Sequence, residues 1–150
     1  SGNVAEDLVF LTSFRPEMIG IGPFIPHHDT VFASYGAGSV DDTLFLLSVL
    51  RIAMPHVLLP ATTALASLSD TEMRDGLLAG ANVIMPNMSP SRTNGLYQLY
   101  DGKKRQSIGA SLEKEISAAS CRPAMVRGDY TDGEGGSLTQ KERTCTIRNQ

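Results

Sequence analysis

Three short apolar runs in the chain each end at a proline, after which the residues become small or polar. They lie at residues 18–23, 57–60 and 81–86. An uninterrupted apolar run of this length is typical of a parallel strand that is buried on both faces. The residues that follow such a strand come to the carboxyl edge of the sheet, where ligands bind. The pattern therefore predicts three parallel strands that deliver polar residues to one edge.

Apolar residues at helical spacing precede each of these runs. They predict helices over residues 3–15, 39–54 and 69–79. Ser39 is a good N-cap for the second helix, and the Ser-Asp-Thr-Glu sequence at 69–72 forms a capping box for the third. Gly80 is suited to the position just after that helix. The alternation of helix and strand predicts an α/β fold with a parallel sheet and right-handed crossovers.

The chain loses this regularity after the third run. Residues 88–107 predict an ordered but irregular excursion, and apolar spacing from Ile108 predicts one more helix that ends near Cys121. Cys121 has no base beside it, so we interpret it as a small buried apolar residue. From Gly128 the sequence is polar and rich in glycine, which indicates a flexible tail. We therefore divide the chain into a folded part at 1–127 and a tail at 128–150.

Three βα units are part of a TIM-type (β/α) barrel, which needs eight strands to close. A lone part would expose two strand edges and the apolar inner face of its sheet. The chain is then a fragment of a longer enzyme, an open three-layer sandwich, or a partner in an assembly. We expect self-association, or a companion that supplies the missing N-terminal half of the barrel. The side chains expected on the exposed inner face are Ile19, Ile21, Val57, Leu59, Val83 and Met85.

Charge and cysteine content restrict the partners. The net charge of −3 argues against a nucleic-acid surface, which would carry a basic stripe. No run approaches the roughly 20 apolar residues that a membrane span needs. Cys121 and Cys145 lie far apart without a CxxC motif, so a disulfide framework or a zinc site is not expected. These features predict a cytoplasmic chain that binds neither nucleic acid nor membranes.

Hydroxyl, amide and thioether groups follow the second and third runs. Thr62 and Thr63 offer two hydroxyls beside backbone N–H groups, an arrangement that suits a carboxylate or another small anion. The alternative is a threonine pair that only ties up a loop. Met85 and Asn87 can present a thioether and an amide to the same cavity. The alternative for Met85 is a place in the core.

Two of the three histidines follow the first run. On an extended chain the adjacent side chains of His27 and His28 point in opposite directions. We therefore expect His27 to face the pocket and His28 to be exposed, and we expect no metal site, since Asp29 is the only carboxylate nearby. His56 precedes its strand, which places it at the opposite end of the sheet in a structural role.

The three strand ends together resemble a known family. The segments Met18–Thr30, Leu59–Leu65 and Gly80–Asn87 are similar to the C-terminal portion of radical S-adenosylmethionine enzymes. The similarity extends from about residue 3 to residue 130. It is strongest to the HydE family of [FeFe]-hydrogenase maturases, in the branch that also holds biotin synthase and its BATS-like C-terminal region. The resemblance implies that the three strands are the sixth, seventh and eighth of a barrel.

The resemblance also implies roles for the strand ends. The first would line the adenine pocket of S-adenosylmethionine with Gly22, Pro23, Phe24 and Ile25, although a strand terminator with a buried phenylalanine is the alternative. In the family, S-adenosylmethionine acts with a [4Fe–4S] cluster, and the enzyme assembles the diiron site of hydrogenase from a small sulfur-containing, cysteine-linked substrate. The residues implied to bind the substrate are His27, Pro60, Thr62, Thr63, Ala64, Met85 and Asn87.

The chain lacks the CxxxCxxC motif that holds the family's cluster. A cluster needs cysteine thiolates, so we expect none to be held by this chain alone, and no catalytic or metal-binding residue is assigned to it. The chain would then contribute cofactor and substrate walls to a longer enzyme. The alternative is a non-catalytic α/β half-barrel that binds a small anion or a protein partner.

Overall fold

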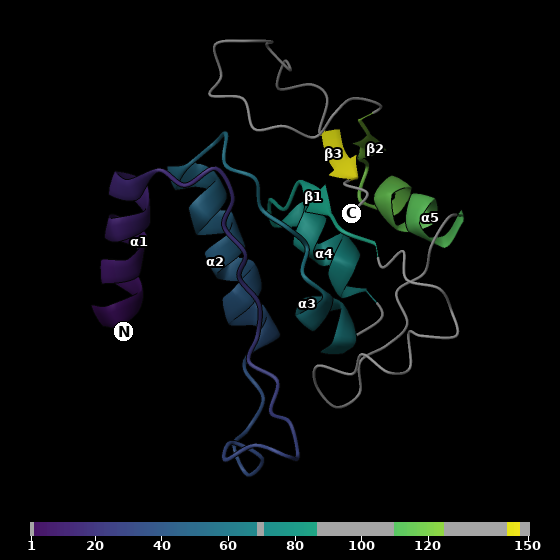
Figure 1. Cartoon of the computed structure of the whole chain (residues 1–150). Helices are drawn as coiled ribbons and strands as arrows, with labels where there is room; N and C mark the ends of the chain where they lie inside the picture. The colour runs from purple at the N-terminus through teal and green to yellow at the C-terminus, as the bar shows by residue number, and fades with distance from the viewer. Residues whose placement is uncertain (1, 69–70, 87–109, 125–143, 148–150) are drawn as a thin grey trace.

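The computed structural model describes residues 2–68, 71–86, 110–124 and 144–147. This part of the chain contains five helices and three short strands, which are labelled in Figure 1. In chain order the elements are α1 (Gly2–Phe14), α2 (Val40–Ala53), α3 (Thr63–Leu68), α4 (Glu72–Leu78), β1 (Val83–Ile84), α5 (Ala110–Ala118), β2 (Arg122–Pro123) and β3 (Thr144–Ile147).

The three apolar runs lie side by side and parallel, in the order in which they occur in the chain. A parallel bridge joins Met18 to Leu58, and a second joins Pro60 to Val83. The amide of Ile19 donates to the carbonyl of Leu58 at 2.9 Å, and the amide of Ala61 donates to that of Val83 at 2.9 Å. The α/β arrangement with parallel neighbours is therefore confirmed. Regular strand geometry is shorter than predicted, because the first two runs form only single bridges.

Two further strands extend this sheet beyond the third run. β3 pairs in parallel with β1, where Val83 is opposite Thr146, and β2 pairs in parallel with β3, where Arg122 is opposite Thr144. The strand order is thus β1-β3-β2, with the last strand of the sequence in the middle. β3 belongs to the segment 128–150, for which the sequence predicts a flexible tail. No pattern in the sequence predicted this strand.

The ends of the helices follow the predicted local signals. Ser39 caps α2, because its hydroxyl accepts the amide of Asp42 at 3.1 Å. Gly80 has a φ of 121°, the left-handed geometry that favours glycine after a helix. Thr71 precedes α4 without a side-chain cap, and Ser69 of the predicted capping box lies outside the described residues. Across the described ranges, no helix has the length and apolarity to cross a membrane.

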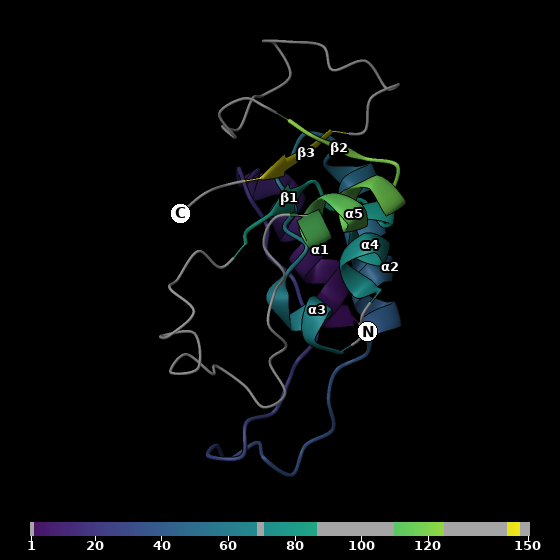
Figure 2. The same ribbon diagram turned by 90° about the vertical axis from the view of Figure 1, so that its right-hand side faces the viewer.

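The helices bury the parallel segments in two adjoining core clusters. The first joins α2 and α3 to the first two runs through Ile19, Leu47, Leu50, Val57, Leu59 and Leu65. The second joins α4 and α5 to β1 through Ala61, Leu77, Ala81, Ile84, Leu112, Ile116, Ala119 and Cys121. Cys121 is buried, as predicted for a small apolar residue. Figure 2 shows α2, α4 and α5 on one side of the strands.

The side chains predicted to form an exposed inner wall of the sheet are buried or half-buried in the structure. Ile19, Val57 and Leu59 are buried and pack with residues of α2, so they face the helices. Val83 is fully buried as well, whereas Ile21 and Met85 are half-buried. The expectation that these side chains form a solvent-exposed wall is therefore wrong. In the first two segments the predicted side chains pack with the helix side, whereas in β1 it is Ile84 that packs with α4 and α5.

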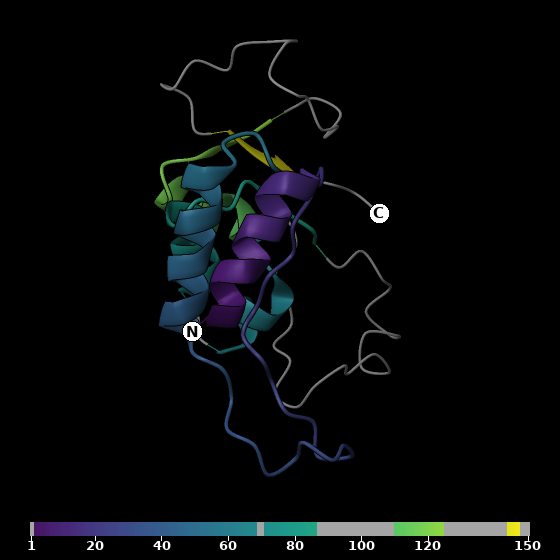
Figure 3. The same ribbon diagram turned by 90° about the vertical axis from the view of Figure 1, so that its left-hand side faces the viewer.

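Exposed apolar surface lies on the helices instead. On α1, the side chains of Val9, Phe10 and Phe14 are each more than 60% exposed. The rings of Phe10 and Phe14 are stacked, with centroids 5.5 Å apart. Figure 3 shows α1 beside α2, where Leu8 and Leu11 pack against the first core cluster. α1 thus uses one face for the core and leaves aromatic side chains exposed on another.

Candidate functional site

The loops that follow the first two runs meet at the carboxyl ends of these segments. A Cβ atom placed on Gly22 would lie 2.8 Å from Oγ1 of Thr62 and 3.3 Å from Cβ of Ala64. Both distances are shorter than ordinary contacts, so the absence of a side chain at Gly22 lets the two loops approach. The structure therefore brings together a residue predicted to bind the cofactor and two predicted to bind the substrate.

The two threonines begin helix α3, which the sequence analysis did not predict. Thr62 lies just before the helix, and its Oγ1 accepts the amide of Leu65 at 3.5 Å. This contact caps the first turn, as the alternative interpretation of the pair expects. A hydroxyl that accepts a hydrogen bond can still donate its own proton. Thr62 and Thr63 are both half-buried, so neither side chain is fully buried in the hydrophobic core.

The first loop places an aromatic ring at the surface. Pro23 is buried and Ile25 is half-buried, but the side chain of Phe24 is 47% exposed. The alternative of a buried phenylalanine at this strand end is therefore wrong. The Phe24 ring makes an edge contact with Phe32, with centroids 6.0 Å apart. Phe32 makes a similar contact with Tyr35 at 5.5 Å, so an exposed aromatic group follows the strand end.

These rings belong to a loop with a closed base, which we call the 24–38 loop. The amide of Gly38 donates to the carbonyl of Phe24 at 2.8 Å. A Cβ atom on Gly38 would lie only 2.7 Å from the backbone nitrogen of Phe24. The two chain segments at the base of the loop can therefore approach closely because Gly38 has no side chain. In Figure 1 this loop extends below the helices.

The third strand end is described only in part. Met85 directly follows β1 and is half-buried, so it is neither a full core residue nor an exposed one. Pro60, on the neighbouring segment, is buried and paired with Val83. Asn87 lies outside the described residues. Its predicted place in the same cavity stays a prediction.

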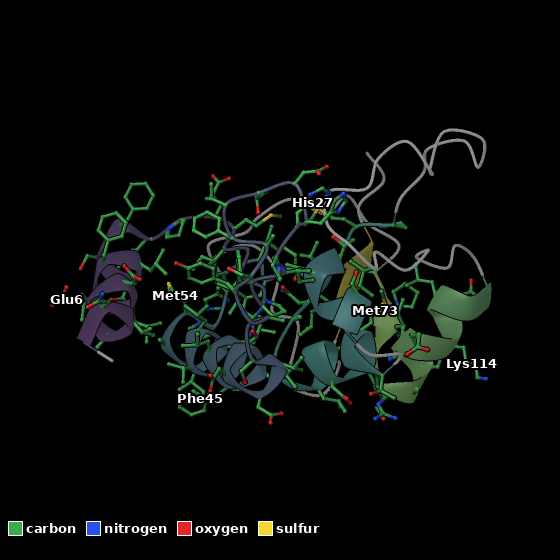
Figure 4. The ribbon with its side chains drawn as sticks, turned by 90° about the horizontal axis from the view of Figure 1, so that it is seen from below. Glu6, His27, Phe45, Met54, Met73 and Lys114 are labelled. Carbon is green, nitrogen blue, oxygen red and sulfur yellow. The ribbon has the colours of Figure 1, made fainter. Side chains whose placement is uncertain are left out.

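The histidines of the 24–38 loop differ from the sequence expectation. His28 is exposed, as predicted, and His27 is half-buried. Their rings, however, are stacked, with centroids 4.4 Å apart and planes 24° apart. The expectation that they point in opposite directions is wrong because this segment is a turn: the amide of Thr30 donates to the carbonyl of His27 at 3.1 Å. Figure 4 labels His27 among the side chains.

The amino ends of the second and third segments are bonded by Arg51 of α2, which sequence reasoning missed. Nε of Arg51 donates to the carbonyl of Gly80 at 2.9 Å, and Nη1 donates to those of Pro55 and Val57 at 2.7 and 2.9 Å. Burial lowers the pKa of Arg51, because desolvation disfavours the charged guanidinium. Nη2 is buried and has no hydrogen-bond partner among the residues that the structure describes. The only sequence signal was a basic residue in the last turn of α2.

Asn82 fixes the third segment to the second. Its side-chain Oδ1 accepts a hydrogen bond from the backbone amide of Leu59 at 2.8 Å. Its backbone amide donates to the carbonyl of Leu59 at 2.9 Å. A polar residue inside the apolar run 81–86 was the signal for this contact. His56 lies exposed in the turn before the second segment, in agreement with a place away from the strand ends that carry Gly22 and Thr62.

Comparison with known proteins identifies a relative of this chain. No family model matches it. The chain is 45% identical over 124 residues to the [FeFe] hydrogenase maturase subunit HydE of Thermotoga maritima. The match covers 83% of this chain but 34% of the relative, so the chain spans about a third of the relative's length. The resemblance to the C-terminal part of a radical S-adenosylmethionine enzyme of this kind is thereby confirmed.

Proposed function

We propose that this chain is the C-terminal segment of a HydE-type radical S-adenosylmethionine enzyme and supplies part of its cofactor and substrate walls. The observation that carries this proposal is the contact of Gly22 with Thr62 and Ala64 at the carboxyl ends of parallel segments. Active sites of (β/α) barrels lie at that end. The three segments would be the sixth to eighth strands of the barrel.

The residues of the first loop are suited to the adenine of S-adenosylmethionine. The half-exposed ring of Phe24 offers a flat apolar face, and Ile25 lies beside it in the chain. Gly22 keeps the two loops close, and Pro23 anchors the segment because it is buried. When bound, S-adenosylmethionine supplies the radical chemistry of the family, while the protein positions it.

The [4Fe–4S] cluster does not fit the residues of this chain. The sequence contains two cysteines, and a cluster is held by three or four thiolates. Cys121 is buried in the core against α4 and α5, where it serves packing. We therefore assign the cluster ligands to the part of the enzyme that precedes this segment.

The second loop would hold the substrate. We propose that Thr62 and Thr63 donate hydrogen bonds to a carboxylate of a small sulfur-containing substrate, between the buried Pro60 and the half-buried Ala64. Neutral hydroxyl and amide donors can bind such an anion without a compensating positive charge. The remaining wall residues would be His27, Met85 and Asn87.

The exposed rings of α1 support the proposal that another part of the protein covers this helix. Phe10 and Phe14 expose about two thirds of their side chains each, and they are stacked on one another. Apolar side chains that gather on one exposed face are a feature of surfaces that contact another part of a protein. We propose that the missing N-terminal half of the barrel covers this surface. Self-association through the same face is the alternative.

A chimaera tests the proposed function directly. The aligned third of the Thermotoga maritima maturase is replaced by this chain, and cleavage of S-adenosylmethionine to 5′-deoxyadenosine is measured under anaerobic, reducing conditions. We expect cleavage, together with an iron content like that of the parent. A chimaera that folds and holds its cluster but cleaves no S-adenosylmethionine would contradict the proposal and favour a non-catalytic module.

The role of the threonines is tested in the same chimaera. The double variant Thr62→Val/Thr63→Val keeps the volume of the side chains and removes both hydroxyls. We expect weaker substrate binding, measured as a higher KM, with a smaller change in melting temperature. Ser67→Ala is the matched control, because its hydroxyl donates to the carbonyl of Thr63 within α3 at 2.8 Å. An equal loss of stability without a change in KM would show that the pair only ties up the loop.

A further inference from the structure

We propose that His27, His28 and Asp29 form a binding site for a divalent transition-metal ion of the nickel or zinc kind. The site would lie in the 24–38 loop. It shares His27 with the proposed substrate wall, but its test needs neither S-adenosylmethionine nor the rest of a barrel, so it can fail or succeed separately from the proposed function. The three residues are consecutive, and the turn at residues 27–30 brings their side chains together.

The distances between the possible ligand atoms support such a site. One ligand atom from each of the three residues lies within 4.8 Å of the other two. Nε2 of His28 and Oδ2 of Asp29 are only 3.2 Å apart. Two ligands that each bind a tetrahedral metal ion at its usual distance are about 3.3 Å from one another. The His28–Asp29 pair already has this separation.

The orientation of His27 points the lone pair of Nδ1 at the backbone amide of Asp29. Nδ1 of His27 accepts the amide of Asp29 at 3.1 Å, which means that this nitrogen is the unprotonated one. A metal ion bound to Nδ1 would replace this hydrogen bond. The exposed amide of Asp29 can then bond to water. The two imidazoles are stacked with centroids 4.4 Å apart, so His28 lies on the same side of the chain, and the rings must rotate out of the stack to direct both lone pairs at one ion.

The turn is held by bonds that do not involve the ligand atoms. Oγ1 of Thr30 donates to the carbonyl of His27 at 2.8 Å, and it accepts the amide of Phe32 at 3.3 Å. The ring of Phe32 packs against Phe24 and Tyr35, which connects the turn to the rest of the loop. The three residues are therefore held near one another before any ion arrives.

The ligand set selects the kind of metal ion. Imidazole nitrogens suit nickel, zinc and copper ions, whereas magnesium and calcium ions prefer ligand sets made of oxygen. His28 and Asp29 are largely exposed, with side-chain fractions of 65% and 76%, so an ion can enter and keep water ligands. The bound ion would have three protein ligands, and water would fill its remaining coordination positions.

Titration of the tag-free chain with NiCl₂ tests the proposal. We expect one ion per chain by isothermal titration calorimetry, and His28→Asn should weaken binding by at least about tenfold. Asp29→Asn should weaken it as well. His56→Asn is the matched control, because His56 is an exposed histidine in a different turn. The titration with MgCl₂ should give no comparable binding.

Paramagnetic line broadening provides a second measurement on the unaltered chain. Sub-stoichiometric Ni²⁺ should broaden the ring signals of His27 and His28 in the NMR spectrum before those of His56. This outcome supports the site even where a variant fails to fold. Equal broadening of all three histidines, or binding by His28→Asn that equals that of the original chain, would overturn the proposal.

Discussion

The two ends of the parallel segments use their side chains in different ways. At the amino ends, Arg51 donates hydrogen bonds to backbone carbonyls, and the side chain of Asn82 accepts one from a backbone amide of the neighbouring segment. At the carboxyl ends, Thr62, Phe24 and His27 keep part of their surface accessible to solvent. The same few segments thus join a tightly bonded end to an open one.

We infer from this difference that residues important for folding stability and residues available for ligand binding lie at opposite ends of the parallel segments. Polar side chains at the amino ends satisfy carbonyl and amide groups that the helix ends and turns leave without partners, a role that contributes to folding. Small and polar residues at the carboxyl ends leave donors and ring faces for a ligand. Substitutions at the amino ends should therefore lower stability, whereas substitutions at the carboxyl ends should change mainly binding.

The largest expected effect is that of Arg51→Met. The variant keeps the apolar stem but removes the donors that serve the carbonyls of Gly80, Pro55 and Val57. We expect the free energy of unfolding to fall by about 2–3 kcal/mol, since bonds to a charged donor are strong and partly buried acceptors are left unpaired. Urea denaturation measures this value.

Arg74→Met is the matched control for this variant. Arg74 pairs with the adjacent Asp75 at 3.0 Å on a partly exposed face of α4. Its removal should cost less than about 1 kcal/mol. If both variants lowered the free energy of unfolding equally, the amino ends would have no special role in stability.

A smaller effect is expected for Asn82→Ala, which removes the acceptor for the buried amide of Leu59. The loss should be about 1–2 kcal/mol, the usual cost of an unsatisfied donor. Amide hydrogen exchange of Leu59 should accelerate more than that of Leu50 within α2. Asn82→Asp retains an acceptor oxygen and should recover part of the protection. Unchanged exchange at Leu59 in Asn82→Ala would show that the side-chain bond is dispensable.

The smallest effect compares two glycines of the first segment. Gly22→Ala places a Cβ atom 2.8 Å from Oγ1 of Thr62, whereas a Cβ atom on Gly20 meets nothing within 4 Å. We expect Gly22→Ala to cost about 1 kcal/mol through overpacking, and Gly20→Ala to be neutral or slightly stabilising. Thermal melting of both variants measures the difference. Similar melting temperatures would mean that the two carboxyl-end loops separate easily.

Local signals allowed much of the helical part to be predicted. The caps at Ser39 and Gly80 act within one turn of the chain, so the sequence contains all the information that they need. The parallel arrangement followed from apolar runs that alternate with helices. The convergence of Gly22 with Thr62 was expected only because the carboxyl ends of parallel strands share one edge.

The features that the sequence did not predict depend on contacts outside a local window. α3 begins at Thr63 and has six residues, too few to show a clear period. β3 has four residues and forms a strand because β1 and β2 provide edges on both sides. The stacking of His27 and His28 depends on a turn that Thr30 closes.

The closed base of the 24–38 loop has a consequence for how such a chain can change over evolution. Because the bond between Gly38 and Phe24 holds the two ends together, the sequence between them can vary in length with little effect on the helices and strands. Doubling the length of a flexible loop costs only about 0.6 kcal/mol in closure entropy. Insertions and deletions should therefore accumulate here, so that new specificities can arise by exchange of one short segment.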